Sequence, residues 1–211
     1  MRTLTKEMQT ALTPVQALEL LKKGNARFVN NLKVNRNLLQ QANETSDSQH
    51  PFAVILSCID SRTSAELIFD QGLGDVFSVR IAGNIVNDDI LGSMEFGCKA
   101  AGAKLIVVLG HTKCGAVKGA CDGVELGHLT SLLNKIQPAV NAERKIAGVH
   151  TNGEFIEKVA LINVKNSVKG ILQSSSILKE LIESGQVGII GGIHDISTGE
   201  VEFLSETAVI Q

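Results

Sequence analysis

The sequence predicts an α/β protein: a mainly parallel central sheet of four strands plus an antiparallel edge strand, flanked by helices, with an N-terminal helical arm. Short apolar runs recur along the chain, as expected of strands buried on both faces. Helical patterns separate most of these runs, and a short late run follows a turn sequence. Because strands and helices alternate, a mainly parallel sheet is the simplest fold.

The N-terminal segment predicts a helix followed by an arm. Thr13 is a suitable cap for this helix, and Pro14 suits its first turn. Apolar residues then recur at helical spacing, with Leu20 widening the face formed by Val15, Leu18, Leu21 and Phe28. Residues 35–50 are polar and rich in Asn, Gln and Ser, which indicates a loop or an extended arm.

The apolar runs that predict strands cover residues 52–56, 76–81, 105–109, 187–191 and 201–204. The last run follows the turn at 197–200 and is expected to join as the antiparallel edge strand. Helices are predicted over residues 89–101, 129–145, 153–168 and 174–184. Gly102 is well placed to end the first of them, and Pro138 should kink or split the second.

The composition favours a soluble globular protein and excludes several classes. The chain has 211 residues, a formal net charge of -2, 44% hydrophobic and 20% charged residues. It has no basic field for nucleic acid or an anionic membrane, and no Trp or Tyr for base stacking. We expect a single domain over 1–211, in which 1–50 form the N-terminal helix and arm and 51–211 form the α/β core.

The N-terminus shows no apolar stretch typical of a signal peptide, and no run approaches the roughly 20 apolar residues of a membrane span. We therefore expect a cytoplasmic protein. Its four cysteines should then be thiols, thiolates or metal ligands rather than disulfides. Cys98 lies on the apolar pattern of a predicted helix and indicates core packing, and Cys121 is interpreted as structural.

Two clusters of reactive side chains follow predicted buried strands. Cys58, Asp60 and Arg62 follow the first strand, whereas His111 and Cys114 follow the third. Ligands of open parallel sheets bind outside the carboxyl ends of the strands, so these clusters are expected to meet. A single Cys beside a strand is more often an apolar filler. Two clusters at two strand ends instead favour zinc, which takes about four Cys, His or carboxylate ligands.

Asp60 and Arg62 stand two residues apart in a loop, a spacing that allows a bidentate ion pair. One interpretation is a salt bridge that braces the loop. The other is a polar dyad beside the metal, in which Asp60 accepts a hydrogen bond from a zinc-bound water and Arg62 keeps Asp60 ionised. A purely structural zinc site needs no such dyad.

The stretch SCIDSRTSAELIFDQGLGDVFSVRIAGN, followed by GHTKCGAVKGA, resembles the β-class carbonic anhydrases. Its CxDSR and HxxCG motifs are highly specific together, and GGIHDISTGEVEFL resembles the closing strand pair of that family. The resemblance implies one Zn2+ per chain, bound by Cys58, His111 and Cys114. It also implies that Asp60 and Arg62 form the catalytic dyad.

The activity implied by the resemblance is the reversible hydration of carbon dioxide to bicarbonate and a proton, by attack of zinc-bound hydroxide. Gln71 resembles the glutamine that reaches the substrate pocket, commonly across a dimer interface. The family also implies a homodimer or tetramer, with the N-terminal helix on a partner subunit. Neither nucleic acid nor a membrane is an expected partner.

Three alternatives stay open. A carbon disulfide or carbonyl sulfide hydrolase would use the same site, and a non-catalytic zinc protein would close it with Asp60 as a fourth ligand. A Rossmann-type oxidoreductase is weaker, because its glycine fingerprint is missing.

In some family members the aspartate closes the site, together with a bicarbonate pocket that contains Trp and Tyr. This chain has neither residue, so we expect an open site at neutral pH, with Asp60 paired to Arg62.

Overall fold

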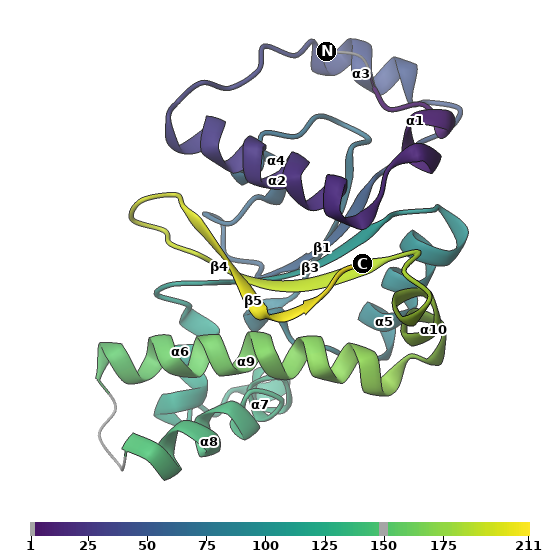
Figure 1. Cartoon of the computed structure of the whole chain (residues 1–211). Coiled ribbons are helices and arrows are strands. Elements are labelled where there is room, and N and C mark those ends of the chain that lie inside the picture. Colours follow the sequence, from purple (N-terminus) through teal and green to yellow (C-terminus); the bar gives the residue numbers. More distant parts are fainter. Residues whose placement is uncertain (1–2, 148–151) are drawn as a thin grey trace.

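The computed structural model describes residues 3–147 and 152–211. Within them, a five-stranded sheet has the order β2-β1-β3-β4-β5 (Figure 1). The parallel strands are β1 (Ala53–Ser57), β2 (Val76–Arg80), β3 (Leu105–His111) and β4 (Gly188–His194). At one edge, β5 (Val201–Val209) pairs antiparallel with β4. The predicted fold class, four parallel strands plus an antiparallel edge strand, is confirmed.

The central strands bring two distant segments to one edge of the sheet. Every residue of β1 and β3 is buried, as the apolar runs predict. The register pairs Ser57 with Leu109, so the chain leaves β1 close to where β3 ends at His111. Strand β5 extends five residues beyond the apolar run 201–204, because its second half alternates exposed and half-buried side chains and lacks an apolar signature.

One face of the sheet is covered by helices that follow β2 and β3 (Figure 1). They are α5 (Asp88–Glu95), a π-helical turn (Phe96–Ala100), α6 (Gly115–Asp122), α7 (Gly127–Asn134), α8 (Gln137–Ala147), α9 (Gly153–Ser174) and α10 (Ser176–Glu183). The predicted split at Pro138 is confirmed, since α7 ends before it and α8 begins at Gln137. Gly102 follows the π-helical turn with a left-handed φ of 83°, as expected of a helix-ending glycine.

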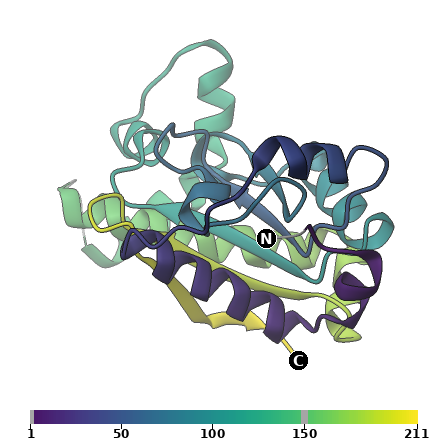
Figure 2. The ribbon, with the colours of Figure 1, turned by 90° about the horizontal axis from the view of Figure 1, so that it is seen from above.

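The other face is covered by α1 (Lys6–Ala11), α2 (Pro14–Val29), α3 (Leu38–Glu44) and the short α4 (Ala65–Ile68). Thr13 caps α2, as predicted, and forms a capping box with Gln16. Seen from above, α2 runs along β4 and β5 (Figure 2), and its buried Asn25 donates hydrogen bonds to the carbonyls of Ile68 and Gly199.

Two expectations for the N-terminal segment were wrong. Val15 was placed on the apolar face of α2, but it is 48% exposed. Residues 35–50 were expected to be a loop or an extended arm, but they contain α3. This helix has no apolar periodicity. It is capped by Asn37, and its buried Gln41 accepts a hydrogen bond from the N–H of Leu73, a contact that the local sequence does not reveal.

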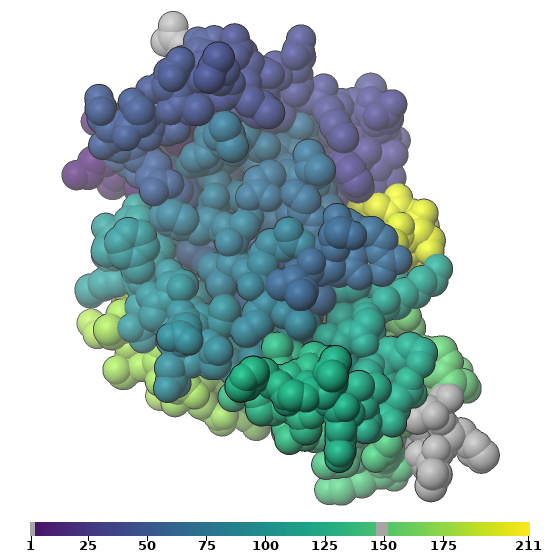
Figure 3. All heavy atoms as spheres, turned by 180° about the vertical axis from the view of Figure 1, so that it is seen from behind, coloured from purple at the N-terminus to yellow at the C-terminus, as the bar shows by residue number. Residues whose placement is uncertain are grey.

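Apolar clusters fill both faces of the sheet, and a third surrounds Cys58 and Cys114. Helix α9 lies directly on the sheet at two glycines. A Cβ at Gly110 or Gly191 would stand 2.6 or 2.7 Å from a methyl of Val164. From behind, the segments coloured blue to teal form the middle of the surface, between the N-terminal helices and the green α7–α8 region (Figure 3). No described helix is long and apolar enough to cross a membrane.

Candidate metal centre

The structure brings together the three side chains that were predicted to bind a metal. Cys58 directly follows β1, His111 is the last residue of β3, and Cys114 is the N-cap of α6. Their ligand atoms all lie within 4.8 Å of one another. The three residues are 1–3% exposed. The ends of the first and third predicted strands therefore meet, as inferred from the parallel order. The three side chains form a compact buried cluster there.

His111 is oriented with one ring nitrogen toward the backbone and the other free. Its Nδ1 lies 2.9 Å from the carbonyl oxygen of Thr112, which can only accept, so this nitrogen carries the proton. The buried Nε2 is then a bare acceptor, with no hydrogen-bond partner among the described residues. Metal-binding histidines are commonly held in this way, with the second nitrogen donating to a carbonyl. An orphaned, buried imidazole nitrogen fits a metal ligand.

The two sulfurs also fit zinc. The Sγ atoms of Cys58 and Cys114 lie 4.0 Å apart. Two zinc–sulfur bonds of about 2.3 Å at a tetrahedral angle would separate them by about 3.8 Å. The pKa of the Cys58 thiol is lowered, chiefly by a hydrogen bond from Cys114 and further by the Gly83 N–H, against the effect of burial. Cys58 and burial raise the pKa of Cys114, and the N–H groups at the start of α6 oppose this only in part, so a cation is what would favour a thiolate at both cysteines.

The turn between His111 and Cys114 is braced from two neighbouring elements. Lys113 has a left-handed φ of 56°, which is unusual for a residue with a Cβ. Its N–H donates to Glu157 Oε1 of α9 at 2.8 Å. The hydroxyl of Thr112 accepts a hydrogen bond from the N–H of Ile196 at 3.0 Å. These contacts stabilise a turn that the sequence alone shows only as an HxxC spacing.

Asp60 and Arg62 form a bidentate ion pair beside the cluster. Arg62 Nε and Nη2 donate to the two carboxylate oxygens of Asp60 at 2.9 and 2.8 Å, and the Arg62 N–H adds a bond of 3.0 Å. Arg62 thereby holds the pKa of the Asp60 carboxyl well below its usual range. The Asp60 oxygens are not part of the group of ligand atoms formed by the cysteines and the histidine. Asp60 is therefore an ionised acceptor whose partner is Arg62.

Arg80 is a residue of this site that the sequence reasoning missed. It is the last residue of β2, and its guanidinium donates to the carbonyls of Cys58 and Asp60 at 3.1 and 2.7 Å. It thus fixes the loop that carries both the sulfur and the carboxylate. The rule that functional groups gather at carboxyl ends of parallel strands would have found it, because β2 ends at the same edge as β1.

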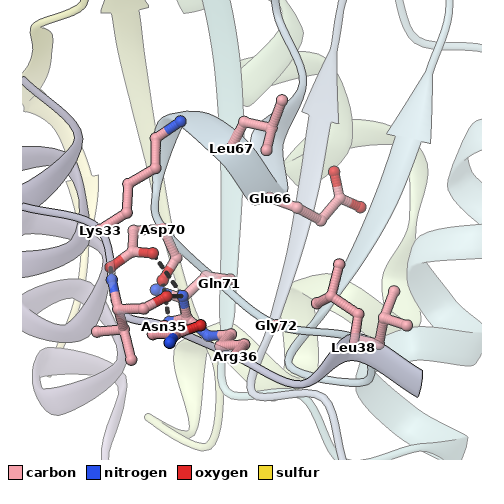
Figure 4. A pocket seen from close by; sticks show the side chains of 11 residues that line it. Lys33, Asn35, Arg36, Leu38, Glu66, Leu67, Asp70, Gln71 and Gly72 are labelled. Carbon is pink, nitrogen blue, oxygen red and sulfur yellow. Dashed lines mark hydrogen bonds and ion pairs between the residues drawn. The ribbon is translucent and has the colours of Figure 1, made fainter. Parts of the chain in front are cut away.

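Gln71 lies apart from the cysteine–histidine cluster. It lines a pocket of 330 Å³, where Figure 4 shows it beside Asp70 and Arg36, with Leu38 farther away. Its side-chain amide donates to the carbonyl of Phe69 at 2.6 Å. Among the described residues, Gln71 makes no hydrogen bond to Cys58, His111 or Cys114, so the structure does not bring this predicted site residue into the cluster within one chain.

His194 occupies the position opposite His111 in the β3–β4 ladder. Burial is the main cause that lowers the pKa of His194 to about 4, so its imidazole is neutral at physiological pH. Both ring nitrogens are buried and have no hydrogen-bond partner in the described ranges. His194 is the last residue of β4, and its burial favours a structural role near the end of the sheet.

Comparisons with known proteins agree on one family. The profile of a family described as carbonic anhydrase matches residues 53–201. The carbonic anhydrase of Mycolicibacterium smegmatis is 36% identical over 199 residues, which cover 91% of this chain and 94% of the relative. Among solved structures, the β-carbonic anhydrase CafA of Aspergillus fumigatus matches with a TM-score of 0.72 and 27% identity, covering 90% of both chains.

A second solved structure is one of two tetrameric β-carbonic anhydrases from Sordaria macrospora. It matches with a TM-score of 0.71 and 25% identity, and the match covers 79% of this chain and 90% of that chain. The matched residues of the family profile begin in β1 and end in β5, and so include both strand ends that carry the cysteines and the histidine.

Proposed function

The chain belongs to the β-class carbonic anhydrase family and is an enzyme of that family, and we propose that Cys58, His111 and Cys114 hold one zinc ion for the interconversion of carbon dioxide and bicarbonate. One observation carries this proposal. The Nε2 atom of His111 is buried and unpartnered, and it belongs to the same group of ligand atoms as two thiol sulfurs. Burying an unpaired polar atom is costly, and what sets Nε2 of His111 apart from other buried, unpartnered atoms, such as the ring nitrogens of His194, is that two thiol sulfurs lie beside it.

A zinc ion held by these donors supplies Lewis acidity, which makes hydroxide available for attack on carbon dioxide near neutral pH. The chain's own residues prepare the site. The Thr112 carbonyl keeps the proton of His111 on Nδ1, so Nε2 stays free to bind. Buried apolar side chains of the third cluster, among them Ile85 and Val117, keep bulk water from the sulfurs. Carbon dioxide and water give bicarbonate and one proton, which must leave the site.

We propose that Asp60 and Arg62 act as a dyad in this reaction. Because Arg62 keeps Asp60 ionised, the Asp60 oxygens retain lone pairs that can accept a hydrogen bond from the attacking hydroxyl and so orient it. The bidentate pair supports an open site at neutral pH, in which the carboxylate stays on Arg62 rather than on the metal. An Asp60 oxygen bound to zinc in crystals grown near neutral pH would contradict this.

We further propose a homodimer or tetramer in which Gln71 serves the site of a partner subunit. Support comes from the pocket around Gln71, whose apolar side chains Leu38, Leu67 and Leu73 are 43–58% exposed. The related enzymes of Sordaria macrospora are tetrameric. In this proposal, residues 1–211 form one domain. Helix α2 packs against the sheet of its own chain, and the outer side of the N-terminal helices contacts the partner. A cytoplasmic location fits the four free cysteines, because zinc thiolates persist under reducing conditions.

Stopped-flow measurement of carbon dioxide hydration, with zinc counted per chain, tests the proposed function. We expect about one zinc per chain and turnover that rises through a single ionisation between about pH 6.5 and 9. Full zinc occupancy without hydration at any pH would reject carbon dioxide as the substrate. The same sample would then be assayed with carbonyl sulfide and carbon disulfide.

A further inference from the structure

We propose that Asn163 of helix α9 is a positioning residue for the metal centre. Its side-chain amide holds the carbonyl of Gly83, and this keeps the Gly83 N–H directed at the sulfur of Cys58. The inference rests on the proposed function, because it assigns Asn163 a role in tuning a zinc-bound thiolate. It adds a residue that lies far from both sequence motifs.

The turn that Asn163 holds has an unusual backbone. Residues Ala82–Asn84 form a tight helical turn in which Gly83 has φ 68° and ψ 19°. The next residue, Asn84, also has a left-handed φ, of 42°. Two successive left-handed residues are rare and persist only where surrounding contacts stabilise them. Within this turn the Gly83 N–H donates to Cys58 Sγ at 3.3 Å.

Helix α9 supplies those contacts with two side chains one turn apart. Asn163 Nδ2 donates to the Gly83 carbonyl at 2.8 Å, and Ser167 Oγ donates to the Asn84 carbonyl at 3.2 Å. Residues at i and i+4 share one face of a helix, so one face binds two successive carbonyls of the turn. Asn163 and Ser167 are 3% and 6% exposed, and hence water does not compete for these hydrogen bonds.

The helix that carries Asn163 is itself held against the sheet. Val164 fills the space left by Gly110 and Gly191, so α9 lies in van der Waals contact with β3 and β4. The same helix carries Glu157, which accepts from the Lys113 N–H in the turn between His111 and Cys114. Helix α9 therefore fixes the turn beside Cys58 and the turn before Cys114 relative to each other.

A purely structural role would be to satisfy a buried carbonyl, as Asn25 does elsewhere in the chain. The two asparagines differ in the residue whose carbonyl they bind. The carbonyl that Asn163 binds belongs to Gly83, whose own N–H donates to a sulfur of the metal group. A hydrogen bond from an N–H group to a thiolate draws negative charge from the sulfur. It therefore changes the bond between that sulfur and the metal. The Asn25 contacts have no such link.

The test compares Asn163→Ala with two matched variants. Asn166→Ala changes the same residue type on the exposed side of α9, and Asn25→Ala removes a buried asparagine away from the metal group. Each protein is loaded with cobalt(II), and its thiolate-to-cobalt absorption is recorded. Zinc affinity is measured by competition with a chromophoric chelator. Both readouts report on the metal–sulfur bonds rather than on turnover. A second variant, Asn163→Leu, also removes the amide but leaves a side chain of similar volume.

We expect Asn163→Ala and Asn163→Leu to shift the cobalt absorption to longer wavelength and to weaken zinc binding by about 10- to 100-fold. Asn166→Ala and Asn25→Ala should keep the wild-type band and affinity, even where Asn25→Ala melts at lower temperature. Wild-type band and affinity in either Asn163 variant would overturn the inference. A wild-type protein without thiolate-to-cobalt absorption would instead overturn the proposed function.

A direct observation on the wild type completes the test and needs no variant. With an NMR-active cadmium isotope in place of zinc, the Gly83 amide proton should show scalar coupling to the metal through the hydrogen bond to Cys58. Absence of coupling and a Gly83 amide that exchanges freely with solvent would overturn the inference.

Discussion

Two buried polar clusters in the described part of the chain differ in whether opposite charges within the chain balance each other. In the first, Asp70 accepts hydrogen bonds from Arg27, Arg36 and the Val34 N–H, so both carboxylate oxygens have partners. In the second, Cys58, His111 and Cys114 converge, and His111 keeps a buried nitrogen without a partner in the described part of the chain. The first cluster neutralises its carboxylate with charges from the same chain; the second has the donor atoms that a metal ion would complete.

This difference separates a structural cluster from a functional one. Opposite charges that pair within the chain stabilise the fold and need no further atom. Contacts among two thiols and an imidazole stabilise the fold less than ion pairs do, because thiols make weak hydrogen bonds. A cation bound by all three, as proposed above, would account for their convergence. Substitutions in the two clusters should therefore affect different properties, the first the stability and the second the activity.

The largest expected effect is that of Cys114→Ala on activity. Loss of one thiolate removes a zinc ligand, and we expect carbon dioxide hydration to fall by at least about 1,000-fold, together with zinc content. Cys121→Ala changes a buried cysteine inside the helix that Cys114 caps; it is the matched control and should retain both activity and zinc. Near-normal hydration by the Cys114 variant would break the distinction between the two clusters.

Asp70→Asn should destabilise the fold while leaving zinc content unchanged. Asn keeps the shape and tolerates the φ of 45° at this position, so the change is mainly one of charge. Asp70 is 4% exposed, and loss of its charge leaves two arginines unpaired, which should lower the free energy of unfolding by about 3 kcal/mol. Urea unfolding measures this. Zinc loss at full folding would show instead that this cluster supports the metal site.

The effect of Asp70 should depend on pH. Burial alone would raise the pKa of Asp70, but the ion pairs with Arg27 and Arg36 outweigh it and hold the pKa below its ordinary value. A carboxyl with a lowered pKa stabilises the fold above its unfolded pKa of about 3.9. That contribution is lost as pH falls through the folded pKa. The difference in unfolding free energy between wild type and Asp70→Asn should therefore be constant above about pH 5 and shrink below about pH 4.

Asp60→Asn should lower activity by about 10- to 100-fold and leave zinc content and stability close to wild type. The amide cannot supply two anionic oxygens to Arg62, so both the ion pair and the orienting acceptor are weakened. Asp122→Asn, which alters an exposed carboxylate paired with Lys118, is the control and should be silent in all three measurements. Equal activity of both variants would show that the Asp60–Arg62 pair only stabilises its loop and takes no part in the reaction.

The smallest expected effect is that of Cys98→Ala. Burial raises the pKa of the Cys98 thiol to about 12, so this residue is an uncharged apolar side chain. Its removal leaves a small cavity in the core, which should cost about 1 kcal/mol in the free energy of unfolding. Zinc content and hydration should not change, and a loss of zinc would contradict the assignment of Cys98 to packing.

The sequence predicted that Cys58, His111 and Cys114 converge, because the topology of the sheet brings them together. Carboxyl ends of adjacent parallel strands meet, and both motifs directly follow β1 and β3. It did not reveal Arg80 or Asn163, whose roles depend on which backbone carbonyls lie opposite them. Such contacts are tertiary, and a lone Arg or Asn in the sequence does not distinguish them.

Local patterns also limited the prediction of the fold. Strands with purely apolar runs were predicted to within two residues at each end, because burial on both faces leaves a strong signature. Helix α3 and the second half of β5 were missed, since their polar sequences are stabilised by distant partners. In β5, Thr207 accepts from the N–H of Gly191, a contact invisible in the local sequence.

X-ray absorption at the zinc edge, on purified protein whose zinc content is known, tests the central claim most directly. We predict one zinc per chain with two sulfur ligands at about 2.3 Å, one imidazole nitrogen at about 2.0 Å and one further light atom. A zinc ion without sulfur neighbours, or a protein that retains no zinc when purified without chelator, would contradict the assignment of Cys58, His111 and Cys114 as its ligands.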